Sequence, residues 1–464
     1  MNINRVILMV LDGVGIGAQP DADQYFQRGE DGKPVSDKSA ATLQNLAMKV
    51  GGFDLPNFER MGLGSILNFV KGEGIANMRP TYSPICFYGK ALEASGAKDT
   101  VFLHWEMMGI ISKGAALFPD GFPDEVIGAI INADYREETK NLGITPETCK
   151  CLTDDYKLKG IIEKANIPIS GTDVIKLYHK PHAETGKLIV YTSADSVLQV
   201  AASEEILPPK LLNAICAKIR NLLGSNTELG KKYGVARIIS RPYTGNDHEH
   251  LERTSNRHDF PLAPPEPTLV DRLHEAGIPT IGIGKVASLF DNRGFSVVDE
   301  KGKDSNIELM GRTLSAMDKY KQGLIFSNLL HFDQSYGHRR DSVGFYRALR
   351  EVDAMLPIFF ERIGMNDLLI ITADHGNDPT YVGSDHTREY VPLFVFHPQV
   401  NGLFSYHDPN GSCRMTYTSI DRMANLKTRT SEADIGQTIA EALLGTPCLQ
   451  NGQSFYRQMK KALG

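Results

Sequence analysis

The chain alternates short, strongly apolar segments rich in Val and Ile with longer amphipathic segments, and this alternation restricts the folds open to it. Seven segments have the length and composition of buried strands, namely 6–11, 187–192, 234–240, 280–283, 323–330, 368–372 and 391–396. Continuous apolar strands are typical of parallel sheets that are covered on both faces. Apolar residues three and four positions apart predict helices over 212–222, 345–359 and 435–443. We therefore expect an α/β protein with a mostly parallel sheet flanked by helices.

The chain is long enough for two domains, because its 464 residues exceed what one compact core usually holds. The segment 261–267, PLAPPEP, excludes both helix and central strand and is typical of a linker. A second boundary is expected at 118–125, FPDGFPDE, which is rich in turn-forming residues. These boundaries predict a discontinuous core of residues 1–117 and 263–464, interrupted by an inserted domain of residues 118–262.

Proteins that bind nucleic acid or anionic membranes usually carry excess positive charge, whereas the net charge of this chain is −6, so neither is expected as a partner. An anionic small molecule stays open, because local cations or bound metal can reverse the sign of the potential inside a site. The apolar run near the N-terminus, VILMVL, is too short for a signal peptide or a membrane span. We therefore expect a cytoplasmic location.

The six cysteines are scattered, and no CxxC pair is present to bind zinc. Only Cys149 and Cys151, in CKC, lie close together in the sequence. Free thiols are the favoured interpretation of this pair, with a redox role as the alternative.

Three of the expected strands lead into an aspartate, which are Asp12, Asp333 and Asp374. Ligands of open α/β sheets bind at the carboxyl ends of the strands, so these aspartates are expected to converge. Three histidines follow at short range, namely His338, His375 and His386. Each aspartate alone is more typical of a helix N-cap or turn, and the metal prediction rests on their coincidence.

Aspartate together with histidine suits divalent ions such as Mn²⁺, Mg²⁺ or Zn²⁺. Six ligands are too many for one ion that must keep open positions, so two ions are expected. Two such ions can clamp the oxygens of a phosphoryl group and activate a Ser or Thr hydroxyl. The sequence therefore predicts a phosphoryl-transfer enzyme.

Several longer motifs carry a family resemblance, namely DGVGIG at 12–17, VYTSADSV at 190–197, NRHDF at 256–260, FDQSYGHRRD at 332–341 and ITADHGNDPTYVGSDHTREYVPL at 371–393. Together they resemble the phosphopentomutases, a family of the alkaline-phosphatase superfamily. The resemblance extends from the N-terminus to about Pro392. It implies an alkaline-phosphatase-like core with an inserted α+β cap domain, which corresponds to residues 118–262. It also implies an isomerase that moves phosphate between C1 and C5 of ribose or 2-deoxyribose, with no obligate protein partner.

The family's nucleophile is a phosphorylated threonine in GKDTxTGHWE, and the matching segment here is AKDTVFLHWE at 97–106, which aligns Thr100 with it. The resemblance implies two Mn²⁺ ions bridged by Thr100, with a sugar bisphosphate as activator and other divalent ions as alternatives. It assigns Asp12, Asp374 and His375 to one ion. It assigns Asp333, His338 and His386 to the other. For the sugar phosphate it points to Ser193, Asp195, Arg237, Arg253 and Lys285, and Arg and Lys are the usual phosphate ligands.

The sequence departs from the family pattern at Ala97, Phe102 and Leu103, within three residues of Thr100. Phe-Leu in place of Thr-Gly adds bulk that is expected to narrow the pocket, change the substrate or weaken catalysis. His331 stands where the family usually has Asp, and the segment from about 398 to 430 is longer than expected. Two alternatives therefore stay open, a phosphatase or phosphodiesterase of the same superfamily and a metal-binding partner protein without catalysis.

Overall fold

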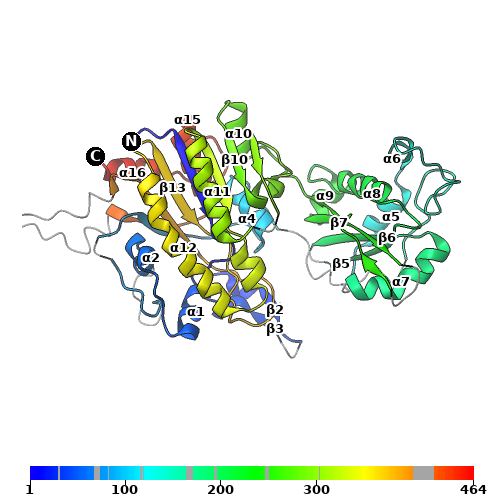
Figure 1. Cartoon of the computed structure of the whole chain (residues 1–464), viewed down its shortest axis with the longest axis horizontal. Helices are drawn as coiled ribbons and strands as arrows, with labels where there is room; N and C mark the ends of the chain where they lie inside the picture. The colour runs from blue at the N-terminus through cyan, green and yellow to red at the C-terminus, as the bar shows by residue number, and fades with distance from the viewer. Residues whose placement is uncertain are drawn as a thin grey trace, which may run out of the picture. The chain divides into compact units, whose positions relative to one another are not determined.

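The computed structural model describes the chain except for residues 30–31, 67–73, 82, 115–117, 119, 163–170, 193–195, 246–249, 303 and 401–422. The chain forms two compact units, which are coloured along the sequence in Figure 1. The core unit is Met1–Lys113 together with Glu266–Gly464, and the inserted unit is Gly114–Pro265. The boundaries expected at 118 and 262 fall inside the inserted unit, a few residues from its ends.

The core unit is built on one eight-stranded sheet in the order β11-β10-β12-β1-β13-β14-β4-β15. The strands are β1 (Arg5–Val10), β4 (Phe87–Ala91), β10 (Thr280–Ile283), β11 (Val297–Asp299), β12 (Gly323–Asn328), β13 (Asp367–Thr372), β14 (Val391–Phe396) and β15 (Asn425–Arg429). The five strands from β11 to β13 in this order are parallel, and β4 is parallel to β15. The predicted α/β class with a mostly parallel sheet is confirmed.

The prediction that residues 391–396 form a parallel strand is wrong, because β14 runs antiparallel to both β13 and β4. A parallel neighbour needs a crossover that returns the chain to the opposite edge of the sheet. Residues 373–390 contain no helix that could make this crossover, so the chain re-enters the sheet in the reverse direction.

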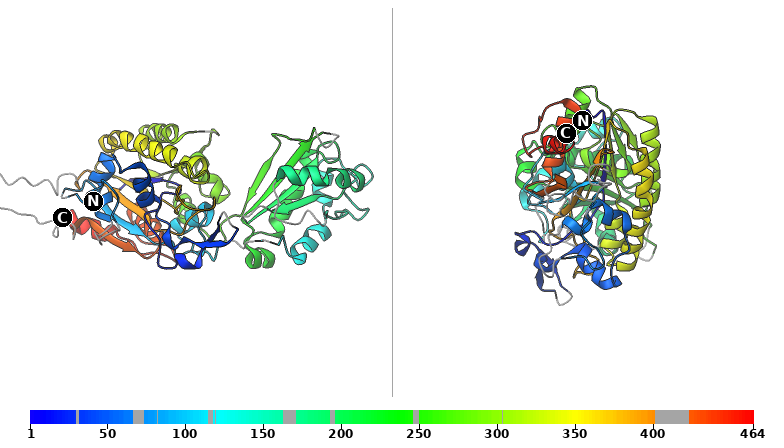
Figure 2. Two further views of the ribbon diagram at one scale, coloured as in Figure 1. Left: turned by 90° about the horizontal axis from the view of Figure 1, so that it is seen from below. Right: turned by 90° about the vertical axis from the view of Figure 1, so that its left-hand side faces the viewer.

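Helices cover both faces of this sheet. One layer contains α1 (Thr42–Val50), α2 (Pro56–Met61), α11 (Asn306–Lys319) and α12 (Ser342–Arg362), and the other contains α4 (Thr100–Met107), α10 (Leu269–Glu275), α15 (Ala433–Leu444) and α16 (Tyr456–Ala462). Figure 2 (right) shows yellow α12 on one side of the sheet and the red C-terminal helices on the other. The helices predicted over 345–359 and 435–443 are α12 and α15. The short elements of this unit are α3 (Leu63–Ile66), β2 (Phe26–Arg28) and β3 (Pro34–Ser36).

The inserted unit has its own five-stranded sheet, in which β6 and β7 are parallel and the other pairs antiparallel. Its strands are β5 (Ile189–Thr192), β6 (Val197–Ser203), β7 (Arg237–Thr244), β8 (Glu252–Arg253) and β9 (His258–Pro261), and its helices are α5 (Asp124–Asn132), α6 (Arg136–Lys140), α7 (Gly171–Thr185), α8 (Pro209–Leu222) and α9 (Glu228–Tyr233). The segments 187–192 and 234–240 therefore belong to this sheet and not to the parallel one. Along β5, Ile189 and Tyr191 pack against α7, whereas Val190 packs in the core formed with α5 and α8.

Candidate metal centre

The strand register of the core unit brings the predicted aspartates to one edge of the sheet. Val10 at the end of β1 pairs with both Asn328 of β12 and Thr372 of β13, so the three strands end at the same level. Asp12 and Asp374 each follow two residues beyond this level, and Asp333 lies in a π-helical turn, Phe332–Gly337, after β12. All three carboxylates are buried.

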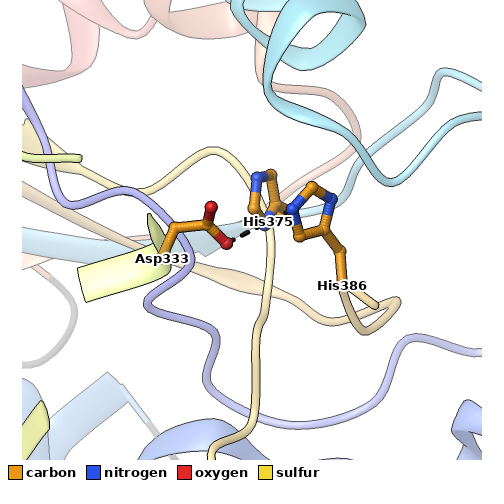
Figure 3. A group of neighbouring side chains, drawn as sticks. All are labelled: Asp333, His375 and His386. Atoms are coloured by element: carbon orange, nitrogen blue, oxygen red, sulfur yellow. Dashed lines mark ion pairs between the residues drawn. The ribbon is translucent and has the colours of Figure 1, made fainter. Parts of the chain in front are cut away.

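The six predicted ligands lie together at this edge. Two groups have ligand atoms that all lie within 4.8 Å of one another, namely Asp12, Asp374 and His375, and Asp333, His375 and His386. Figure 3 shows the second group, in which the carboxylate of Asp333 faces the stacked imidazoles of His375 and His386. The Nε2 atom of His338 lies 3.1 Å from Asp333 Oδ2 and 3.1 Å from His386 Nε2. His375 thus takes part in both groups, and the division of ligands between two ions stays a prediction.

The hydrogen bonds of the three imidazoles fix which ring nitrogen faces the centre. Nδ1 of His338 donates to Ser384 O at 2.6 Å, and Nδ1 of His386 donates to Lys98 O at 2.6 Å. Nδ1 of His375 donates to the carbonyl of the following residue at 3.1 Å. Because a carbonyl oxygen only accepts, each Nδ1 carries a proton, so Nε2 is the nitrogen that faces inward and carries the lone pair when the ring is neutral. This is the arrangement of metal-ligating histidines.

The residues present fit divalent cations. Three inward lone pairs facing three buried carboxylates repel one another unless positive charge lies between them. The Oδ2 atom of Asp374 is buried and has no hydrogen-bond partner among the described residues. Oxygen and imidazole donors together are the ligand set of Mn²⁺, Mg²⁺ and Zn²⁺.

The pKa values of these groups show the same excess of negative charge. Burial raises the pKa of Asp12 well above its usual value, and the neighbouring carboxylates of Asp374 and Asp333 raise it further. Burial alone would lower the pKa of His386, but Asp333 and other carboxylates raise it to about 10. Burial lowers the pKa of His375 to about 4. Without metal, a proton on His386 therefore supplies part of the positive charge that the centre needs.

The predicted nucleophile lies within this cluster. Thr100 is the first residue of α4, and the side chain of Asp99 caps the helix by accepting from Val101 N at 3.0 Å. The Oγ1 atom of Thr100 lies 3.1 Å from His375 Nε2 and 3.4 Å from Asp12 Oδ1. A hydroxyl at a helix N-terminus among metal ligands suits transfer of a phosphoryl group, because the helix dipole also favours an anion there.

Arg388 holds the loop that precedes Thr100, and sequence reasoning missed this residue. Its buried guanidinium donates to the carbonyl oxygens of Glu93, Ser95 and Ala97 at 2.6, 2.7 and 2.7 Å. It also pairs with the carboxylate of Glu93 at 2.9 Å and with that of Asp21 at 3.0 Å. Arg388 stands two residues after His386, so one short segment carries both a candidate ligand and the support of the nucleophile loop.

Two asparagines orient the aspartates and were also missed. Asn328 Nδ2 donates to Asp12 Oδ2 at 2.7 Å, and Asn377 Nδ2 donates to Asp333 Oδ1 at 2.6 Å. Asn328 is the last residue of β12, five positions before Asp333, and Asn377 stands two positions after His375 in DHGND. Their closeness to predicted ligands in the sequence was the signal that could have identified them.

Comparison with known proteins identifies the family. The model of the metalloenzyme superfamily matches residues 4–446. A phosphopentomutase of Alkaliphilus oremlandii is 37% identical over 99% of this chain and 100% of its own length. One of Symbiobacterium thermophilum is 38% identical over 99% of both chains, and one of Syntrophotalea carbinolica is 40% identical over 85% of this chain and 88% of its own. The chain belongs to the phosphopentomutase family. A solved alkaline phosphatase from the Antarctic bacterium TAB5 aligns with 96% of this chain and 99% of its own at a TM-score of 0.32 and 10% identity, too low to support any inference.

The departures from the phosphopentomutase pattern beside Thr100 lie in the core of the protein. Phe102 and Leu103 are buried, and Phe102 packs edge-on against Trp105 with ring centroids 5.1 Å apart. The Trp105 indole N–H donates to Leu289 O at 2.7 Å. The Phe102 side chain therefore takes part in core packing under α4. Ala97 contributes its carbonyl to the Arg388 network.

The predicted substrate contacts are distributed over both units. Ser193 and Asp195 lie outside the described residues. Arg237 and Arg253 begin β7 and end β8 of the inserted unit. Lys285 is exposed in the helical turn that follows β10 of the core unit, at the carboxyl edge of the sheet. Their roles in binding stay predictions.

His331 is half-buried before the π-helical turn, where its backbone N–H donates to Asn306 Oδ1 at 3.1 Å. Among the described residues, neither group of candidate ligand atoms includes it. Most of the long segment 398–430 lies outside the described residues. None of the helices in the described parts of the chain is long and apolar enough to span a membrane.

Proposed function

We propose that the chain interconverts the 1-phosphate and 5-phosphate of ribose or 2-deoxyribose through a phosphorylated Thr100. It is a phosphopentomutase, an isomerase, by its family. The observation that carries the mechanism is the Thr100 hydroxyl at 3.1 Å from His375 Nε2, among five candidate ligands in two groups and His338 beside them. Two divalent ions held by these ligands, Mn²⁺ in our proposal, would lower the pKa of the hydroxyl and neutralise phosphoryl oxygens.

The reaction conserves phosphate. Phospho-Thr100 gives its phosphoryl group to O5 of the incoming 1-phosphate, which yields a 1,5-bisphosphate and a free Thr100 hydroxyl. The bisphosphate then turns, and the hydroxyl takes the phosphoryl group from O1, which leaves the 5-phosphate. A sugar bisphosphate is the activator in this scheme, because it phosphorylates Thr100 whenever the group has been lost to water.

We propose that the inserted unit acts as the cap over the substrate. For contacts to the sugar phosphate we propose Ser193, Asp195, Arg237, Arg253 and Lys285, because guanidinium groups bind phosphate oxygens in pairs and lysine supplies a positive charge. A covered site excludes water and favours return of the phosphoryl group to the sugar over hydrolysis. The substrates are doubly charged sugar phosphates that do not cross membranes unaided, which fits a location in the cytoplasm.

The test combines product analysis with intact mass. Ribose 1-phosphate, Mn²⁺ and a catalytic amount of ribose 1,5-bisphosphate should yield ribose 5-phosphate, and the protein should gain one phosphoryl group. Thr100→Ala should abolish both readouts, whereas the control Thr446→Ala at an exposed position should keep them. Free phosphate released faster than ribose 5-phosphate would instead establish a hydrolase. A folded, metal-loaded protein that never gains the phosphoryl group would refute the mechanism.

A further inference from the structure

Two cysteines of the inserted unit, to which no role is assigned above, face each other. Cys149 and Cys151 lie in the segment between α6 and α7, and both side chains are buried in the core that contains Cys216 and Tyr135. Their Sγ atoms are 2.8 Å apart, which is closer than two sulfur atoms that only pack together. The two thiols are therefore placed for direct reaction with each other.

Backbone hydrogen bonds hold the two sulfurs in this arrangement. The N–H of Cys149 donates to Thr145 O at 3.0 Å, and the carbonyl of Cys149 accepts from Leu152 N at 3.2 Å. The carbonyl of Cys151 accepts from Lys159 N at 2.9 Å. Because these bonds fix the backbone on both sides of Lys150, the Cα–Cβ bonds of the two cysteines keep their directions.

The two thiols differ in acidity, as the attacking and the resolving thiol of a redox pair do. The hydrogen bond from Cys151 lowers the pKa of Cys149 to about 7, although burial acts against it. The N–H groups of Cys151 and Leu152 and the charge of Lys159 contribute to the same lowering. By contrast, burial raises the pKa of Cys86 and Cys216 well above the usual value, so these thiols stay protonated and unreactive.

We propose that Cys149 and Cys151 form a redox-active pair that closes to a disulfide on exposure to a small hydroperoxide such as hydrogen peroxide. The oxidant must be small, because the two residues are 2% and 1% exposed. The proposal is independent of the proposed function, since the pair shares no residue with the metal centre.

The chemistry balances in two steps. The Cys149 thiolate attacks one oxygen of the peroxide, the O–O bond breaks, and the departing hydroxide takes up a proton to become water. The sulfur of Cys151 then attacks the resulting Cys149 sulfenic acid, an S–S bond forms, and the S–O bond breaks. The thiol proton of Cys151 leaves with the hydroxyl group as a second water. Two thiols thus lose two electrons and the peroxide gains them.

Lys150 makes the test direct, because trypsin cuts between the two cysteines. The native, metal-loaded chain is treated with one equivalent of hydrogen peroxide, alkylated under denaturing conditions and digested without reductant. We expect a disulfide that links peptides 141–150 and 151–157, and its loss after dithiothreitol. In the native protein, a small alkylating reagent should consume Cys149 about tenfold faster than Cys86 or Cys216 at neutral pH.

Cys86→Ser and Cys216→Ser are the matched controls and should keep the linked peptides, whereas Cys149→Ser and Cys151→Ser should lose them. The peptide analysis of the wild-type chain decides the test, so a variant that fails to fold does not weaken it. Peptides 141–150 and 151–157 that stay unlinked in wild type overturn the proposal. Linkage of either peptide to Cys86 or Cys216 in place of its neighbour overturns it as well.

Discussion

Arg388 offers the sharpest test of how the chain positions Thr100. We consider Arg388→Lys, which keeps the positive charge and removes the planar fork. The guanidinium makes six hydrogen bonds, to the carboxylates of Asp21 and Glu93 and to the carbonyls of Glu93, Ser95 and Ala97. A lysine ammonium has three donors, so at least three of these acceptors lose their partner.

Each buried acceptor left without a partner costs about 1–3 kcal/mol of stability. Three acceptors at about 1 kcal/mol each therefore lower the free energy of unfolding by about 3 kcal/mol. The side chains of Arg388 and Glu93 are 3% and 0% exposed, so solvent screens little of this loss. The released carbonyls belong to Glu93, Ser95 and Ala97, in the segment that leads through Lys98 and Asp99 into Thr100. A displacement of the hydroxyl by about 1 Å would reduce kcat about 100-fold.

The assay is the conversion of ribose 1-phosphate to ribose 5-phosphate at saturating Mn²⁺, at a temperature where the variant is folded. Phosphorylation of Thr100 by a sugar bisphosphate is followed by intact mass in the same samples. We expect kcat and the rate of phosphorylation to fall together, while KM changes little. Arg347→Lys, at an exposed position of α12, is the control. An Arg388→Lys protein with lowered melting temperature but unchanged kcat would refute the positioning role and leave only a structural one.

Three further predictions concern the metal centre and the core beneath it. Chelation should abolish activity and lower Tm, and Mn²⁺ at a hundredfold excess over its Kd should restore about 2.7 kcal/mol of stability for each of the two ions, as thermal melts in a Mn²⁺ titration will show. The raised pKa of His386, about 10, keeps its proton at neutral pH, whereas His375, at about 4, has none to release. Mn²⁺ affinity should therefore rise with pH, by up to about tenfold per pH unit for each proton that binding releases. Isothermal titration calorimetry in buffers with different heats of ionisation measures this release. Equal heats of Mn²⁺ binding in all buffers would contradict the prediction. Phe102→Ala should lower the free energy of unfolding by about 3–5 kcal/mol in urea titrations, because its ring fills core space against Trp105. A collapse of kcat with unchanged stability would instead place the ring in the active site.

The strands that carry the site were predictable because their signal is local. β1, β12 and β13 are fully buried, and each contains an apolar run that leads to an aspartate two to five residues beyond the strand. The direction of β14 was not predictable, because periodicity is the same in a parallel and an antiparallel strand. β4 and β15 were missed because FYGKA and NLKTR interrupt the apolar run with Gly or charged residues, and β15 is a half-exposed edge strand.

The same distinction divides the residues of the site. The proximity of Asp12, His375 and Thr100 was predictable, because their side chains are of types that ligate or react and they stand in recognisable segments, and their roles stay predictions. Arg388 acts on residues almost 300 positions earlier in the chain, and no local pattern encodes such a pairing. Asn328 acts only through the oxygen of Asp12 that it orients. Sequence reasoning therefore finds the groups that do chemistry more readily than the groups that hold them in place.

The charges of the centre explain how a chain of net charge −6 can hold a doubly negative phosphate group. Three aspartates contribute three negative charges, and the three imidazoles contribute none once their Nε2 lone pairs bind metal. Two divalent ions would bring four positive charges, so the loaded centre would carry one net positive charge in a buried, weakly screened site. With only one ion the same ligands would be net negative and would repel phosphate. In the proposed mechanism, occupation of both sites would therefore be a condition for binding the substrate as well as for activating Thr100.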